Sequence, residues 1–153
     1  MKHTKKMYLI TIITVSALSF KTSCNRINAA ISYGELVDKI TILSIKLERI
    51  TDQEKLKNIA VELNSLLATF DEYIGDRNDV EELKILLKKV NEILWNIEDD
   101  IRVKERKKEF DDEFIALARG VYSTNDKRMA LKKRIDIVCG SHITEEKSYE
   151  SYT

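Results

Sequence analysis

Apolar residues recur at alternating intervals of four and three positions along most of the chain after residue 31. This spacing places them on one face of an α-helix, so it predicts amphipathic helices over about residues 32–50, 51–74, 78–108 and 111–139. Short polar links separate the four segments. Amphipathic helices joined by short links bury their apolar faces against one another. The pattern therefore predicts an all-α protein, an antiparallel up-and-down bundle of four helices.

Residues that cap helices mark the ends of these segments. Three capping-box sequences, Ser32–Glu35, Thr51–Glu54 and Asn78–Glu81, stand at predicted helix starts. In each, the first side chain can accept a hydrogen bond from the backbone N–H three residues later. Gly75 stands at the predicted end of the second helix, where glycine adopts the left-handed backbone conformation without a steric cost. The apolar pattern of the fourth segment ends at Gly140.

The fourth helical segment, which is expected to begin at Asp111 or Asp112, has a polar interruption. Thr124 and Arg128 occupy positions where its apolar stripe would continue. Either the helix breaks near residues 124–126, which would produce a fifth helix, or it carries a polar layer into the interior. Ser, Thr, Asn and Asp side chains compete for cap geometry, and we therefore expect a break or a kink.

Residues 1–26 differ from the rest of the chain. They begin with lysines, contain no acidic residue and include an uncharged apolar run, Met7–Phe20. These features are typical of a secretory signal, with cleavage after Cys24 or Ala29. As a helix the run would reach about 21 Å, short of the ~30 Å hydrocarbon core of a bilayer. We expect an exported or membrane-anchored protein if this leader engages the membrane or secretion machinery, and a cytoplasmic protein otherwise. Residues 27–153 are expected to form a single domain.

The end of the chain is expected to differ from the helices before it. Residues 143–152 lack helical spacing. We expect this segment to run extended along the bundle and to pair with the segment before Ser32.

Composition excludes several classes of protein. The chain of 153 residues is 43% hydrophobic and 34% charged, which suits one folded domain and excludes a disordered chain. Formal net charge is zero, and the basic runs at 104–108 and 132–134 lie near helix C-termini, where they complement the helix dipole. Nucleic acid is therefore not an expected partner. With two cysteines and two histidines, no metal or other cofactor is expected, and Cys139 is interpreted as a small apolar residue at a helix end.

Polar and aromatic side chains on three predicted helices flank the apolar stripes. A buried arginine needs carboxylate partners, because an unpaired buried charge is costly. One interpretation is a polar pocket between helices, with Trp95 and Tyr122 as its walls. The other is a set of exposed ion pairs that fix helix register, the commoner outcome for charged flanks of bundle helices. The candidate site residues are Glu35, Asp38, Lys39, Trp95, Glu98, Asp99, Arg102, Tyr122, Asn125, Asp126 and Arg128.

Four segments carry a resemblance to a known family: Ser32–Leu43, Asn91–Arg102, Ala118–Arg134 and Glu145–Tyr149. They resemble a bacterial family of small helical proteins, domain of unknown function 6165, over nearly the whole chain after residue 26. The resemblance implies that the candidate site residues belong to the family pattern, but it implies no activity. It also suggests a link to cell-surface polysaccharide genes. Gly120 stands where alanine is usual in the family, and we expect it to loosen its helix by ~1 kcal/mol.

No catalytic signature accompanies the bundle, since the sequence has neither a Gly-rich phosphate loop nor a nucleophile elbow. We therefore expect a helical interaction or ligand-binding module, accessory to cell-envelope polysaccharide assembly. Its expected partner is a protein or a small anionic ligand, and a homodimer is compatible with the long helices. The alternative is a small all-α enzyme acting on an anionic metabolite or nucleotide. That enzyme would use Glu35, Asp38, Glu98 and Asp99 as acid–base groups or Mg²⁺ ligands and Arg128 as an anion clamp.

Overall fold

The computed structural model describes residues 27–150 and places four helices in this range. They are α1 (Tyr33–Arg49), α2 (Gln53–Tyr73), α3 (Asn78–Lys107) and α4 (Asp112–Cys139). The described residues contain no strand, so the prediction of an all-α bundle of four helices is confirmed. Among these residues, no helix combines the length and apolar character needed to cross a membrane.

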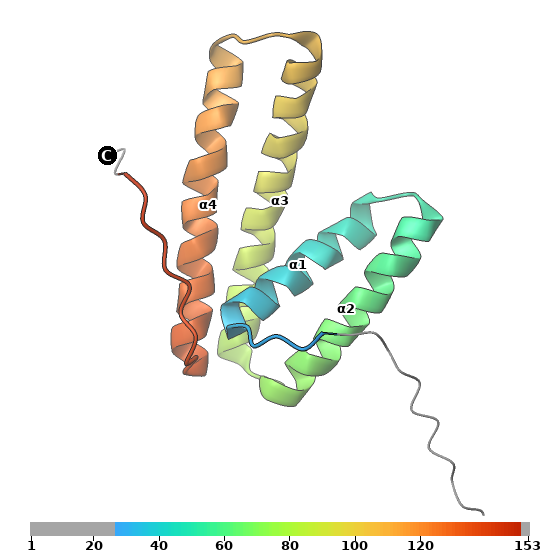
Figure 1. The fold of residues 1–153 in the computed structure, drawn as a ribbon, viewed down its shortest axis with the longest axis vertical. Helices are drawn as coiled ribbons and strands as arrows, with labels where there is room; N and C mark the ends of the chain where they lie inside the picture. The colour runs from blue at the N-terminus through green and yellow to red at the C-terminus, as the bar shows by residue number, and fades with distance from the viewer. Residues whose placement is uncertain (1–26, 151–153) are drawn as a thin grey trace, which may run out of the picture.

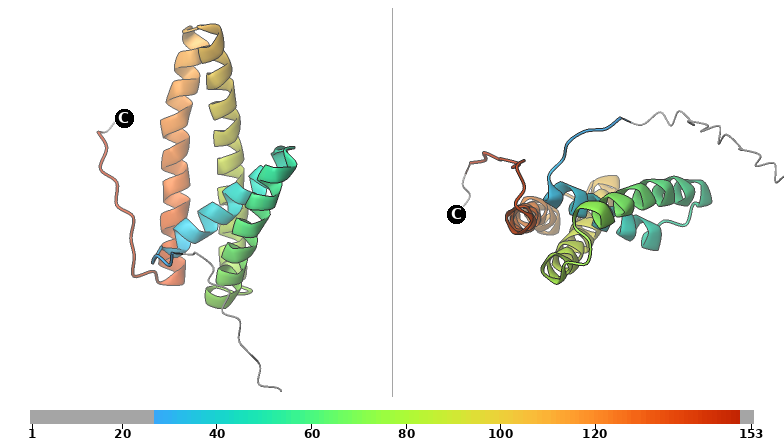
Figure 2. Two further views of the ribbon diagram at one scale, coloured as in Figure 1. Left: turned by 45° about the vertical axis from the view of Figure 1, so that its right-hand side comes forward. Right: turned by 90° about the horizontal axis from the view of Figure 1, so that it is seen from below.

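The helices form two antiparallel hairpins of unequal length. Helices α3 and α4 make the long hairpin, and α1 with α2 makes the shorter one (Figure 1). Helix α1 crosses the lower half of the long hairpin and is the helix whose backbone approaches all three others. The upper half of the α3–α4 hairpin extends beyond the shorter hairpin in both views along its length (Figures 1 and 2). Side-chain burial agrees with this arrangement. In the upper half of the long hairpin, no residue from Glu92 to Ser123 is fully buried.

The core lies where α1 meets the other three helices. Ile40, Leu87 and Ile135 are at most 2% exposed and come from α1, α3 and α4. The complete cluster of buried apolar residues is Leu36, Val37, Ile40, Leu43, Ile59, Leu63, Phe70, Ile74, Val80, Leu87 and Ile135. The apolar stripe of α3 continues beyond this cluster to Ile101, but there it is only partly covered.

Three of the helix starts have side-chain caps. Ser32 Oγ accepts from the backbone N–H of Glu35 at 3.2 Å, as the first capping box predicts. At α2 the cap is Asp52 rather than Thr51, and at α4 it is Asp111. The expected cap by Asn78 is wrong: α3 begins with Asn78 inside the helix, and the residue before it, Arg77, makes no side-chain capping hydrogen bond.

The α3 start and the helix ends have identifiable local causes. Asp79, in the first turn of α3, forms a two-point ion pair with Arg77 at 3.1 and 2.7 Å. Gly75 adopts φ of 63°, which confirms the left-handed helix end predicted there. Gly140, where the pattern of the fourth helix was predicted to end, also adopts a left-handed φ, of 67°. The structure adds a third left-handed position, Lys108 at φ 60°, which ends α3 without a glycine.

The expected break in the fourth helix is wrong. Helix α4 is continuous from Asp112 to Cys139, so there is no fifth helix among the described residues. Asn125 Nδ2 donates to the carbonyl of Val121 at 3.0 Å, within the helix, instead of starting a new one. Thr124 is buried and Arg128 turns toward α1, so the polar stripe faces the interior. The polar-layer alternative is the one that the structure adopts.

Gly34 lets α1 approach α4 closely. A Cβ atom at this position would collide with the backbone carbonyl of Lys132. The Gly34 N–H also donates to Asp136 Oδ1 at 2.6 Å in a buried hydrogen bond. Glycine is therefore required here by the contact between two helices rather than by its own backbone angles.

The segments outside the helices were predicted only in part. Residues 142–150 have no regular secondary structure, and they do not pair as a strand with the residues before Ser32 that the structure describes. Cys139 is free and half-buried at the end of α4, and burial raises the pKa of its thiol. The leader, residues 1–26, lies outside the described residues.

Candidate functional site

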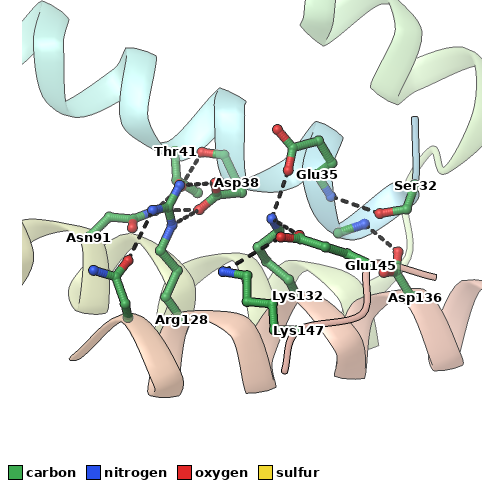
Figure 3. A network of polar contacts seen from close by, with 12 residues as sticks. Ser32, Glu35, Asp38, Thr41, Asn91, Arg128, Lys132, Asp136, Glu145 and Lys147 are labelled. Carbon is green, nitrogen blue, oxygen red and sulfur yellow. Dashed lines mark hydrogen bonds and ion pairs between the residues drawn. The ribbon is translucent and has the colours of Figure 1, made fainter. Parts of the chain in front are cut away.

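A buried polar layer joins α1, α3 and α4 at their crossing (Figure 3). Asp38 on α1 is 1% exposed. Arg128 on α4 donates to both of its carboxylate oxygens, from Nε at 2.9 Å and from Nη2 at 2.5 Å. This two-point geometry is the strong form of an arginine–carboxylate pair. The hydrogen bond to Asp38 is the main reason that the pKa of Arg128 is raised.

The rest of this layer satisfies the remaining polar atoms. Asn91 Nδ2 on α3 donates to Asp38 Oδ1 and to Thr41 Oγ1, both at 2.9 Å. Thr41 in turn donates to the Asp38 carbonyl at 2.8 Å. No buried side-chain nitrogen or oxygen of the described residues lacks a partner. The layer is therefore closed, which is the condition under which a buried ion pair is tolerated.

A second polar group lies beside the first, toward the N-terminus of α1. Lys132 on α4 is 8% exposed, and its ammonium lies 2.7 Å from Glu35 Oε2 and 2.5 Å from Glu145 Oε2. Burial lowers the pKa of Lys132, but the hydrogen bonds to Glu145 and Glu35 outweigh that effect and the net shift is upward. Glu35 thus pairs across the helix interface, in addition to its backbone role at the start of α1.

A cavity of about 370 Å³ opens on the other side of the layer, between α1 and the two long helices. Apolar side chains supply most of its surface, among them Ile42, Ile45, Leu94 and Trp95. The Trp95 indole N–H has no hydrogen-bond partner among the described residues. The guanidinium of Arg49 lies 5.7 Å from the centre of the indole ring, a cation–π contact that holds the ring in place.

Charged groups form the polar part of the same cavity. Arg102 and Glu98 pair with each other at 2.7 Å, one helical turn apart on α3. Asp99 lines the cavity and has no ion pair or side-chain hydrogen bond within the described chain. Arg128 reaches this cavity from the polar layer. The cavity therefore has an aromatic wall and two polar groups that are free to bind another molecule, the indole N–H of Trp95 and the carboxylate of Asp99.

The candidate residues from the sequence fall into separate groups. Those that line the cavity beside Trp95 include Glu98, Asp99, Arg102 and Arg128. Asp38 and Asn125 contact Arg128 in the polar layer, and Arg128 Nη1 donates to Asn125 Oδ1 at 3.3 Å. Glu35 belongs to the group around Lys132. The residues placed elsewhere are Lys39, which faces Glu62 of α2 at 3.8 Å, and Tyr122 and Asp126, which line neither this cavity nor the one beside Lys132. Tyr122 is therefore not the second wall that the sequence suggested.

Sequence reasoning missed several members of the site. Thr41 and Asp136 look like ordinary helix-surface residues, and Glu145 lies outside every helix. Lys132 was attributed to helix-dipole compensation because it belongs to a basic run, but its side chain points inward to Glu35. The spacing of the two residues could have indicated this. Arg128 and Lys132 are four residues apart on one helix and share a face, so an arginine that points inward predicts that the lysine also points inward.

The comparison with known families supplies a match over most of the chain. The sequence model of a family of unknown function (DUF6165) matches residues 27–153. No curated protein and no solved structure matches the chain. The four segments that carry the resemblance described above converge on the polar layer and on the two cavities beside it. Within residues 27–150, no group of three or more histidine, cysteine, aspartate or glutamate side chains is arranged to hold a metal ion.

Proposed function

The chain belongs to the family of unknown function DUF6165, and we propose that it is a non-catalytic binding module that holds a small ligand in the cavity beside Trp95. The observation that carries the proposal is the pairing of an apolar aromatic wall with polar groups that have no partner among residues 27–150. Pockets that bind small molecules are mostly apolar, with a few placed polar groups that orient the ligand. Trp95, with its free N–H, and Asp99, with its free carboxylate, match that description.

The charge distribution argues against catalysis by the neighbouring carboxylates. Both oxygens of Asp38 accept hydrogen bonds from Arg128, and one of them also accepts from Asn91. Glu35 pairs with Lys132 at 2.7 Å. A general base must reach the proton that it removes, and carboxylates held in closed pairs are poorly placed to do so. This argument applies to Asp38 and Glu35, the two acid–base candidates of the alternative enzyme that lie in closed pairs, and for this reason we prefer a binding function.

The chemistry of the cavity favours a sugar unit as the ligand. A pyranose ring has an apolar C–H face, which packs on an indole ring, and hydroxyl groups, which bond to carboxylates and to guanidinium groups. Trp95 supplies the ring surface, and Asp99 and Arg102 supply the polar contacts. This ligand class agrees with the expected role as an accessory of cell-envelope polysaccharide assembly, which we retain as part of the proposal.

Tryptophan fluorescence tests the proposal directly, because Trp95 is the one tryptophan of the chain. The full-length protein is titrated with glucose, N-acetylglucosamine, glucuronate and UDP-glucose while Trp95 emission is recorded. We expect a saturable change with at least one of these probes. Removing a charged hydrogen-bond acceptor from the site weakens binding by about tenfold or more, so Asp99→Asn is expected to raise the dissociation constant to that extent.

The neighbouring residue provides the control. Asp100 is exposed on the same helix and does not line the cavity, so Asp100→Asn is expected to leave the titration unchanged. Two results would contradict the proposal: emission that does not change with any probe, or equal weakening by both substitutions. The first would favour a protein partner for this face.

A further inference from the structure

A second cavity lies on the opposite side of Arg128 and is lined almost entirely by polar atoms. Its volume is about 240 Å³. Cations surround it: Arg128 and Lys132 from α4 and Lys147 from the C-terminal segment. Two carboxylates face them, Glu35 from α1 and Glu145 from the same C-terminal segment (Figure 3).

The helical part of this cavity is held rigidly in place. Arg128 is fixed by Asp38 and Asn125, and the backbone at Lys132 is packed against Gly34. The Lys132 side chain is nine-tenths buried and lines the cavity. A buried ammonium needs more than one hydrogen-bonding partner, because it has three donors and a high desolvation cost. Glu35 provides one acceptor, and the second comes from outside the helices.

That second acceptor belongs to a segment with few other contacts. Residues 142–150 are exposed along their whole length. Beyond Ile143, the contacts of this segment are ion pairs: Glu145 with Lys132 at 2.5 Å and with Lys147 at 3.5 Å, and Glu146 with Lys133 at 4.0 Å. No apolar side chain of the segment is buried against the helices. The Lys132 side chain is buried, but that of Glu145 is 42% exposed, so water and solute anions reach this pair from the side of Glu145. The other ion pairs of the segment are exposed, contribute little stability and are screened by salt. A solute anion can therefore displace the segment.

We propose that this cavity is a binding site for a small carboxylate ligand, and that the Glu145 carboxylate occupies the site when the ligand is absent. The ligand carboxylate takes the place of Glu145 as the second acceptor for the Lys132 ammonium. Arg128, on the wall of the cavity, supplies a further positive charge toward the ligand. The volume admits a molecule of a few carbon atoms. Binding of the ligand releases the C-terminal segment from α4.

The test compares full-length wild-type protein with Glu145→Gln, using succinate as the probe. Isothermal titration calorimetry is performed against sodium chloride of equal ionic strength, and inorganic phosphate is titrated in parallel. In wild-type protein succinate competes with Glu145, whereas in the variant the site is open. We expect Glu145→Gln to bind succinate at least tenfold more tightly than wild type, and to bind it more tightly than phosphate.

A second readout follows the release of the segment. Trypsin cleaves after Lys147, and succinate is expected to accelerate that cleavage in wild-type protein relative to sodium chloride. The matched control is Glu146→Gln, because Glu146 is the next residue and, among residues 27–150, its ion pair is with exposed Lys133. This control is expected to behave as wild type in both measurements.

The outcomes separate the proposal from its competitors. Equal succinate affinity in wild type and Glu145→Gln, or an equal gain in Glu146→Gln, overturns it. Tighter binding of phosphate than of succinate overturns the assignment of the ligand class. Trp95 lies at the other cavity, so this result is independent of the fluorescence titrations proposed above.

Discussion

The lower half of the α3–α4 hairpin, where α1 crosses it, differs from the upper half, residues 92–123, in how its charges are used. In the lower half, Arg128 meets a carboxylate that is 1% exposed, and every buried side-chain nitrogen and oxygen there has a partner. In the upper half, Lys104 lies within 4 Å of three carboxylates at the α3–α4 turn, those of Glu109, Asp111 and Glu113. The side chains of these three partners are 45–69% exposed.

The difference shows that burial, rather than the number of partners, decides what an ion pair does. Around Lys104, whose own side chain is 14% exposed, water solvates the three carboxylates whether or not they pair, so the cluster contributes little stability. Around Asp38, water is excluded, so a carboxylate without Arg128 would be strongly destabilising. The buried pair therefore specifies how α1 docks on the long hairpin, whereas the exposed cluster only supports the turn and the start of α4.

The largest expected effect comes from breaking the buried pair. Arg128→Met leaves Asp38 buried without its cation, and we expect a loss of about 3–5 kcal/mol in the free energy of unfolding, measured by urea denaturation. The double substitution Asp38→Leu with Arg128→Met removes both charges and is expected to recover most of that loss, because Asn91 keeps its bond to Thr41. A loss below about 1 kcal/mol in the single variant would mean that the Asp38–Arg128 pair contributes no more than an exposed ion pair.

Two glycine substitutions probe the packing of the two halves. Gly34→Ala is expected to destabilise by about 1–3 kcal/mol, because the new methyl group meets the fixed backbone of Lys132. Gly120→Ala places its methyl group 3.2 Å from Cδ1 of Ile97, a flexible side chain in the half that no third helix covers. There the side chain can yield, and we expect a gain of up to ~1 kcal/mol from helix propensity. Thermal denaturation of both variants measures the contrast, and destabilisation by both would show that the upper half is packed as tightly as the lower.

The smallest effect is expected at the exposed cluster. Lys104→Met should lower the melting temperature less than either destabilising change above, and the difference from wild type should vanish in high salt. The hydrogen bond from Lys104 is the main cause of the lowered pKa of Asp111. Because the pKa of Asp111 is lowered in the folded protein, its carboxylate stabilises the fold at any pH above the ordinary pKa of about 3.8. This contribution is lost as the pH falls through the lowered pKa. A salt-independent effect of Lys104→Met would contradict this account.

Local signals in the sequence were sufficient for most of the helix boundaries. Ser32 and Asp111 cap helices near where the pattern indicated, and Gly75 and Gly140 end them. These features depend on a few neighbouring residues, so a linear pattern contains the information. The prediction failed at Asn78, which lies inside α3, and the Arg77–Asp79 ion pair stands at this helix start instead.

The error in α4 had a different origin. The residues around Asn125 are suited to end a helix, and the sequence around them does not show that Arg128 has a partner 90 residues earlier in the chain. That partner makes the polar stripe an interior feature and keeps the helix continuous. In the same way, nothing near Glu145 in the sequence indicates that its carboxylate reaches Lys132.

The sequence by itself determined the four helices, most of their ends and the presence of a polar interruption in the fourth. Those properties arise from the helical period and from contacts over three or four residues, which the order of the residues specifies. Only the tertiary structure decided that α1 covers one half of the long hairpin and leaves the other uncovered. It also decided which charges are buried and which face water. Those outcomes depend on which surfaces meet across long separations in the chain, and the apolar stripe of α3 has the same spacing in the covered and the uncovered half.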